Sequence, residues 1–176
     1  MKFKLTKKQL TYALDLAMRR HDAKHKSVRN KDIDRFRNDN KSKMSEKFKV
    51  DFQYMAHFLG VIGELGYSLA TGEEMDEEIY AVRDSGQDFD GVEVKTITYM
   101  GAGEPELKIP VYEYEKRTPP KLYVLARFNS NINEVDVLGT ITRNQFDKTK
   151  KKKQYGVGKP LNYIVPLSTM SEIQDA

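Results

Sequence analysis

The chain has 176 residues, of which 39% are hydrophobic and 32% charged, and these values are typical of one folded domain with a heavily hydrated surface. It contains no cysteine, which excludes disulfides and cysteine-based zinc sites and suits a reducing cytoplasm. No apolar run approaches the ~20 residues of a membrane span, and no apolar stretch follows the basic start as it would in a secretory signal, so we expect a soluble cytoplasmic protein with no membrane partner.

The net charge of +4 is unevenly distributed along the chain. Residues 1–50 hold sixteen basic and six acidic side chains, residues 51–120 hold five and fifteen, and residues 121–176 hold nine and five. A phosphate-binding protein with a carboxylate-held metal needs cations for the polyanion and carboxylates for the metal. We therefore expect a single domain over 1–176 with a basic helical arm at 1–50 and a core at 51–170, although basic arms that are simply hydrated fit the same numbers.

The first expected helix begins after Thr6. The stretch TKKQ is a capping-box pattern, in which Thr6 and Gln9 satisfy backbone N–H groups at the helix start. Leu5 before the cap and Leu10 at the fourth helical position fit a hydrophobic staple, and an apolar stripe follows at helical spacing. Residues 26–47 are polar and bury little, which predicts a mobile connection or a short exposed helix.

A longer helix is expected from about Phe48 to Ala70, ended by Gly72 in the left-handed conformation. Its glycines recur at every third position in GVIGELG (60–66). Each costs ~1 kcal/mol of helix propensity relative to alanine, so their presence predicts close packing against another backbone. Glu64 interrupts this apolar stretch, where a carboxylate is least expected without a partner.

The second half of the chain carries the strand patterns. Extended segments are expected at 79–82, 92–99, 107–114, 121–128, 134–142 and, at a sheet edge, 161–167, with a basic loop at 148–153. The segment VEVKTITY (92–99) alternates strictly between two faces, and the Asn-rich stretch before Glu134 predicts a hairpin. Helices before and around a central meander indicate an α/β or α+β fold.

Asp90-Gly91 is the strongest two-residue hairpin signal in the chain, because a type I′ turn needs positive φ at both central positions. With that turn, Phe89 pairs with Val92. The pairing brings the residues on either side of the turn together on one face of a hairpin.

The same turn places Asp88 directly opposite Glu93, with Cβ atoms ~4.5–5.5 Å apart, and Lys95 shares the face of Glu93. Opposed carboxylates destabilise a ladder, and a divalent cation such as Mg²⁺ or Mn²⁺ removes the repulsion, because one or two carboxylates and substrate phosphate oxygens are its typical ligands. Such an ion activates a water for phosphodiester hydrolysis. Lys95 would position that water or neutralise the transition state, and Glu64 could reach the site as an outer ligand. A surface hairpin with a diagonal salt bridge is the simpler alternative.

These residues together resemble a known family. A glycine-flanked helical glutamate (GVIGELGYSLATG, 60–72), an aspartate on a strand, a turn and EVKT (93–96) are similar to the motifs of the PD-(D/E)XK nuclease superfamily, and KLYVLARF (121–128) and EVDVLGTITRNQF (134–146) resemble core strands of its phage-type members. The likeness covers roughly residues 55–167. It implies a restriction-endonuclease-like core, with a central mixed sheet of about four to five strands flanked by helices.

The resemblance also implies roles for individual residues. Asp88 and Glu93 match the carboxylates that hold Mg²⁺ (or Mn²⁺), joined by the backbone carbonyl of Val94. Lys95 matches the lysine that assists the attacking water, and Glu64 matches the helical glutamate that completes the site.

The sequence departs from the family pattern at one point. Gln87 stands where the eponymous proline is expected, and the spacing from the aspartate to the glutamate is short. Asp90 and Asp84 are therefore alternatives to Asp88 as the first metal ligand.

The expected function is metal-dependent hydrolysis of DNA, with cleavage inside a strand favoured over cleavage from an end. The phosphate backbone would be held by the basic arm and by Lys150, Lys151, Lys152 and Lys153, although a merely hydrated loop fits these lysines too. A non-catalytic DNA-binding module on the same fold, or a nuclease acting on RNA or branched DNA, stays open. So does the choice between a monomer and a homodimer.

Overall fold

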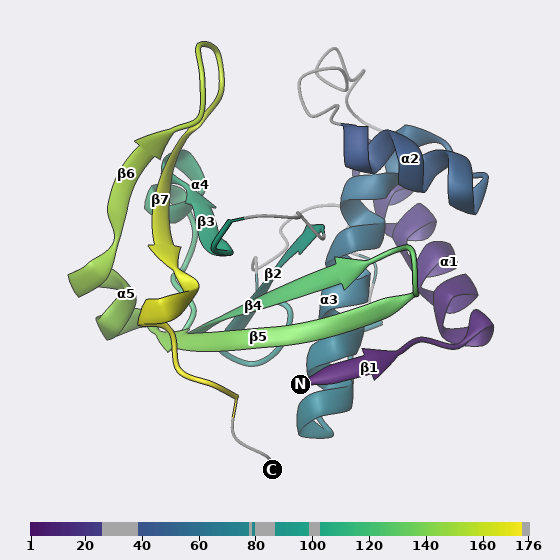
Figure 1. Ribbon diagram of the computed structural model, residues 1–176, viewed down its shortest axis with the longest axis horizontal. Coiled ribbons are helices and arrows are strands. Elements are labelled where there is room, and N and C mark those ends of the chain that lie inside the picture. Colours follow the sequence, from purple (N-terminus) through teal and green to yellow (C-terminus); the bar gives the residue numbers. More distant parts are fainter. Residues whose placement is uncertain (26–38, 78, 80–86, 99–102, 174–176) are drawn as a thin grey trace.

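The computed structural model describes residues 1–25, 39–77, 79, 87–98 and 103–173, and its α+β architecture confirms the expected fold class (Figure 1). In chain order the elements are β1 (Lys2–Lys4), α1 (Lys7–His25), α2 (Asp39–Phe48), η2 (Phe52–Tyr54), α3 (Met55–Thr71), β2 (Val92–Thr98), β3 (Glu106–Pro110), α4 (Val111–Lys116), β4 (Leu122–Asn129), β5 (Glu134–Thr142), α5 (Arg143–Thr149), β6 (Lys151–Gln154), β7 (Leu161–Pro166) and η3 (Leu167–Thr169). A central mixed sheet packs against helices on one face, and a smaller sheet lies beyond the other.

The central sheet has four strands in the order β1-β5-β4-β2. β2 runs parallel to β4, from the pair Val92↔Leu122 to the pair Thr98↔Phe128, and the other neighbours are antiparallel. β4 is buried on both faces, which explains why KLYVLARF reads as a nearly continuous apolar run. β2 stands at the edge of this sheet, so one side of its backbone is accessible to residues outside the sheet.

Helix α3 packs directly on the central sheet, and two of its glycines permit the close approach. A Cβ atom at Gly63 would lie 1.9 Å from Thr96 Oγ1, and one at Gly66 would lie 2.7 Å from a methyl group of Val135. At Gly60 the nearest atom would be Glu64 Oε1 at 3.9 Å, so this glycine is not needed for packing. The expectation of close packing is therefore confirmed for Gly63 and Gly66 only.

Two hydrophobic cores lie on opposite faces of the central sheet. The larger one joins α1 and α3 to residues such as Val94 and Val124. The smaller one joins the opposite face of the sheet to the second sheet, which has the order β3-β7-β6, and its members are Leu107, Ile109, Tyr123, Ile141, Phe146 and Val165. The second sheet was not expected from the sequence, although β7 and part of β3 fall on predicted extended segments.

The start of the chain follows the local signals. Gln9 Oε1 accepts the N–H of Thr6 at 2.9 Å and Thr6 Oγ1 accepts the N–H of Gln9 at 3.2 Å, which confirms the capping box. Leu5 and Leu10 are both buried. Of the segment 26–47, residues 26–38 lie outside the described residues, and the remainder is helical in α2.

The helix expected at 48–70 is wrong at its start. α2 ends at Phe48, Lys49 takes a φ of 54°, and Asp51 caps the following turn by accepting the N–H of Gln53 at 3.2 Å. α3 therefore begins only at Met55 and runs to Thr71, and the φ of 76° at Gly72 confirms the left-handed cap.

Several expectations for the strands also need correction. The loop expected at 148–153 is wrong, because α5 extends to Thr149 and Lys151–Gln154 forms β6. β7 is the middle strand of the second sheet, not an edge. The extended piece at 107–114 ends at Pro110, where α4 begins. The strand expected at 79–82 lies outside the described residues except for Ile79, which is not in a strand.

Among the helices that the structure describes, none combines the length and apolar content that crossing a bilayer requires.

Candidate functional site

The turn at Asp90-Gly91 is present, but it is not of type I′. Phe89 and Val92 form the expected antiparallel bridge, with the N–H of Val92 donating to Phe89 O at 3.1 Å. Gly91 has a φ of 76°, whereas Asp90 is not among the described non-glycine residues with positive φ. The prediction of the turn type was therefore wrong, although the pairing of Phe89 with Val92 is confirmed. That bridge is isolated, and the strand pairs of the described residues do not include the expected pair of Asp88 with Glu93.

Asp88 lies against the free edge of β2. Its Oδ2 accepts the N–H of Val94 at 2.7 Å, and its own N–H donates to Val92 O at 2.9 Å. The carboxylate is thus fixed beside the peptide group of Val94, the residue between Glu93 and Lys95.

Glu93 and Lys95 project from the same face of β2, as the alternation predicted. Lys95 Nζ lies 2.6 Å from Glu93 Oε1 and 3.6 Å from Glu113 Oε2 on α4. Burial lowers the pKa of Lys95, but the two carboxylates outweigh this effect and raise the pKa above its ordinary value. Lys95 therefore carries a positive charge at neutral pH.

Glu64 reaches the site from the opposite face, on α3. It is 4% exposed, and both of its oxygens accept from Arg20 Nη1 at 2.8 Å. Arg20 Nη2 also donates to the carbonyl of Asp76 at 2.7 Å. One guanidinium on α1 thus joins the buried glutamate of α3 to the segment that follows that helix.

The carboxylates lie close enough to affect one another. Burial raises the pKa of Asp88 to about 7, and the charges of Glu64 and Glu93 add to the rise, while the Val94 N–H and the Lys95 ammonium oppose it. All four predicted catalytic residues are therefore gathered around the edge of β2, with Glu64 on one side and Glu93 and Lys95 on the other.

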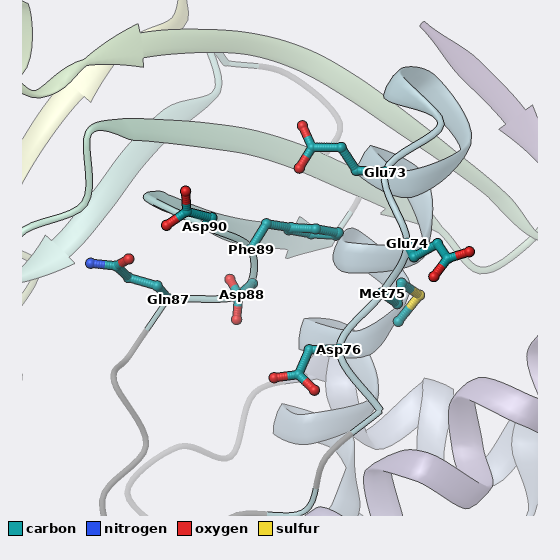
Figure 2. Close-up of a pocket in the computed structure, with 8 residues that line it drawn as sticks. All are labelled: Glu73, Glu74, Met75, Asp76, Gln87, Asp88, Phe89 and Asp90. Carbon is teal, nitrogen blue, oxygen red and sulfur yellow. The ribbon is translucent and has the colours of Figure 1, made fainter.

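An acidic hollow opens beside Asp88 (Figure 2). It has a volume of about 490 Å³, and two segments face each other across it, residues 73–76 after α3 and residues 87–90 before β2. Five of its eight lining residues are acidic, namely Glu73, Glu74, Asp76, Asp88 and Asp90. Asp88 belongs to this lining, whereas Glu64, Glu93 and Lys95 do not, so solvent reaches the Asp88 carboxylate through an opening whose potential favours cations.

The alternatives to Asp88 as first ligand differ in their position. Asp90 is fully exposed in the turn, and Lys121 Nζ lies 3.9 Å from its carboxylate. Asp84 lies outside the described residues. The geometry therefore favours Asp88 over Asp90.

The residues present fit a divalent cation. Among the described residues, four carboxylates (Glu64, Asp88, Glu93, Glu113) lie near two cationic side chains (Arg20, Lys95), so carboxylates outnumber cations in this part of the structure. Within the described parts of the chain, no three acidic or histidine side chains meet closely enough to form a complete metal cage. Magnesium does not need one, because it is usually held by one or two carboxylates and keeps several waters.

The four predicted DNA-binding lysines are not equivalent. Lys150 is half-buried, and its ammonium donates to Tyr114 Oη at 2.8 Å and to Asp147. Lys151, Lys152 and Lys153 lie on β6, where all three are exposed. Lys150 is therefore held by the protein itself, whereas the other three side chains are exposed and Lys153 also donates to Glu106 at 3.0 Å.

Sequence reasoning missed Arg20 and Glu113. Arg20 continues the buried stripe of α1 after Ala13 and Ala17, so a charged residue within an apolar stripe was a signal for it. Glu113 lies in a short helix that the sequence did not predict, and its position next to Lys95 had no local signal.

Comparison of the chain with family models, with curated proteins and with solved structures finds no match in any of the three.

Proposed function

We propose that this protein is a nuclease that hydrolyses phosphodiester bonds in DNA with the help of Mg²⁺ or Mn²⁺. The observation that supports the proposal best is the convergence of Asp88, Glu93 and Lys95 at the edge of β2, beside the buried Glu64. Gathering carboxylates in a partly buried place costs free energy unless a cation compensates them. A metal site explains why the chain tolerates this cost.

Asp88 and Glu93 would hold the metal, together with the backbone carbonyl of Val94 that the resemblance implies, and Glu64 would act as an outer ligand. When bound, the ion supplies a Lewis acid and lowers the pKa of a coordinated water. The hydrogen bond from the Val94 N–H holds the Asp88 carboxylate beside the backbone of Val94, the residue whose carbonyl would supply the third oxygen.

Lys95 would contribute charge and not accept a proton. Its raised pKa keeps it protonated, and an ammonium cannot take a proton from water. It can hold the attacking water or a phosphate oxygen, and it offsets the negative charge that develops on the phosphate. Glu93 and Glu113 keep its Nζ in place on this face of β2.

The proposal is tested by incubating supercoiled plasmid and single-stranded DNA with the protein in Mg²⁺, in Mn²⁺ and in chelator. We expect cleavage only with metal, and nicking of the closed plasmid would identify an endonuclease. Glu93→Gln, Lys95→Ala and Asp88→Asn should each lose about 10²-fold or more in rate. Asp90→Asn is the matched control and should stay active. Activity that persists in chelator, or that depends on Asp90 and not on Asp88, would contradict the assignment.

A second candidate, a DNA-binding module without catalysis, has one observation in its favour. Lys95 is bridged by Glu93 and Glu113, and Glu64 is paired with Arg20, so these charges are partly satisfied inside the protein. If wild type and Lys95→Ala bind DNA equally and no plasmid, single-stranded, branched or RNA substrate is cut with metal, the module is favoured. If only RNA or branched DNA is cleaved, the proposed substrate is wrong but the proposed catalytic residues stand.

A further inference from the structure

The second sheet presents one face to its own core and one face to solvent. Strand pairing places Lys151 and Lys108 on either side of Ile164, one residue from each of β6, β3 and β7. Lys153 lies two residues beyond Lys151 and therefore on the same face. Leu107 and Val165 alternate with them and are buried in the core. We call the solvent-facing set Lys108, Lys151, Lys153 and Tyr155 the outer patch.

Because successive side chains of a strand point to opposite faces, the lysines of β6 lie on two different faces of the second sheet. Lys152 pairs with Tyr163 across the sheet, and its Nζ lies 5.5 Å from the centre of that ring. Tyr163 packs against the core, so Lys152 belongs to the inner face, as does the tethered Lys150. Lys152 is as exposed as Lys151 and carries the same charge, but it points to the other side of the strand.

Two lysines of the outer patch make cation–π contacts with the ring of Tyr155. The ammonium groups of Lys108 and Lys153 lie 4.0 and 4.7 Å from the centre of its ring. Glu106 accepts from Lys153 at 3.0 Å and from the Tyr155 hydroxyl, and its Oε2 lies 3.7 Å from Lys108 Nζ, so this carboxylate pairs with two of the three lysines. Three lysines against one glutamate leave a positive patch around an aromatic ring.

The loop beyond Gln154 extends this surface. β6 and β7 form a hairpin whose tip projects away from the body of the protein (Figure 1). Val157 at the tip is fully exposed, and Tyr155 and Leu161 on either side are also exposed. Three of the eight large hydrophobic side chains that are exposed in the described chain thus lie within seven residues. The lysines of the hairpin strands suit the phosphate backbone of a nucleic acid, and the apolar side chains at the hairpin tip suit the groove beside that backbone.

We propose that the outer patch and the hairpin tip form a docking surface for duplex nucleic acid, with Lys108, Lys151 and Lys153 on phosphates and Val157 against the groove. The proposal rests on the proposed function, because it names the surface that holds the substrate. β3, which carries Lys108, runs directly into α4, whose Glu113 contacts Lys95. The docking surface and the candidate site are therefore joined by one continuous segment.

Binding is measured by fluorescence anisotropy of a labelled DNA duplex in chelator, over a range of NaCl concentrations, so that no cleavage is required. Lys108→Gln, Lys151→Gln and Lys153→Gln should each weaken binding roughly fivefold to tenfold at 0.1 M salt and lower the slope of log K against log salt by about 0.9. Val157→Ser should weaken binding and leave the slope unchanged, since it removes no charge.

Lys152→Gln is the control, because it removes the same charge from the same strand on the inner face. It should change the slope by less than half as much as Lys151→Gln. Thermal melts of each variant confirm that it is folded. An equal loss of DNA affinity in Lys152→Gln and Lys151→Gln would overturn the proposal. So would a triple variant, Lys108→Gln/Lys151→Gln/Lys153→Gln, whose salt slope equals that of wild type. Tight binding to anionic vesicles without binding to the duplex would also overturn it.

The two proposals fail in different ways. If the duplex binds through the outer patch but no metal-dependent cleavage occurs, the docking surface stands and the nuclease does not. If cleavage occurs and the triple variant Lys108→Gln/Lys151→Gln/Lys153→Gln keeps wild-type KM and slope, the nuclease stands and the docking surface is wrong.

Discussion

Arg20 binds both carboxylate oxygens of Glu64 at 2.8 Å, so the buried acid of the candidate site is paired by a residue 44 positions earlier in the chain. The same guanidinium holds the carbonyl of Asp76, in the wall of the acidic hollow. This contact couples three parts of the molecule, namely α1, α3 and the segment after α3. Its loss should therefore affect both the stability of the fold and the shape of the site.

Replacing Arg20 by alanine should destabilise the protein by about 3–5 kcal/mol, because it removes the guanidinium that binds both oxygens of a buried carboxylate. Urea unfolding at neutral pH measures the change. Arg19→Ala is the control, since Arg19 is exposed and, among the described residues, forms its ion pair with Asp15 one turn away, and it should cost less than about 0.5 kcal/mol. Adding Glu64→Gln to Arg20→Ala should restore part of the loss, and purely additive effects would show that the pair is not coupled.

The sequence predicted those features of the fold that depend on neighbouring residues. Three such features are the capping box of Thr6 and Gln9, the left-handed Gly72 and the β4–β5 hairpin. Each is determined by residues only a few positions apart, so a short sequence pattern is enough to predict it. The pairing of Phe89 with Val92 and the shared face of Glu93 and Lys95 follow from the same kind of local geometry.

Long-range contacts explain the failures. β3 pairs with β7, which follows about fifty residues later, and no local pattern indicates that partner. The lysines of β6 resemble a loop because both faces of that edge strand carry them, and lysine on an edge strand is a common defence against unwanted pairing. Arg20 and Glu113 come to the site from α1 and α4, and their roles depend on packing that the sequence alone does not describe.

Asp88→Asn should stabilise the metal-free protein. Burial and the nearby Glu64 raise the pKa of Asp88 to about 7, so at pH 8 the ionised form is disfavoured in the folded state, and removing its charge should raise the free energy of unfolding by about 1–3 kcal/mol. Urea unfolding in chelator measures this difference. Mg²⁺ should raise the melting temperature of wild type more than that of the variant. Asp90→Asn should change neither the free energy of unfolding nor the rise in melting temperature with Mg²⁺. If Asp88→Asn is less stable than wild type, the carboxylates around Asp88 do not carry an excess of negative charge.

Asp147 should stabilise the fold only above acidic pH. Partial burial raises the pKa of Asp147, but hydrogen bonds from Lys150, Tyr114 and Arg143 outweigh it and lower the pKa to about 2. The unfolded chain therefore takes up this proton first, and the contribution of Asp147 is present above about pH 4 and lost as the pH falls toward 2. Asp147→Asn should be less stable than wild type at pH 7, with a difference that shrinks between pH 4 and pH 2. A difference that is constant over this range would show that ionisation of Asp147 is not involved.

Two glycines of the same helix should respond to alanine in opposite directions. Gly63→Ala places a methyl group 1.9 Å from Thr96 Oγ1, so α3 must move away from β2, at a cost of about 1–3 kcal/mol or more. Gly60→Ala would meet Glu64 Oε1 at 3.9 Å as its nearest side-chain neighbour among the described residues, and it should stabilise the protein by up to about 1 kcal/mol because alanine favours the helix. Urea unfolding of both variants provides the comparison. Since α3 carries Glu64 and packs on the strand that carries Glu93 and Lys95, Gly63→Ala should also impair any metal-dependent activity, whereas Gly60→Ala should retain it. If both substitutions destabilise the protein equally, the close contact with Thr96 does not distinguish Gly63 from Gly60.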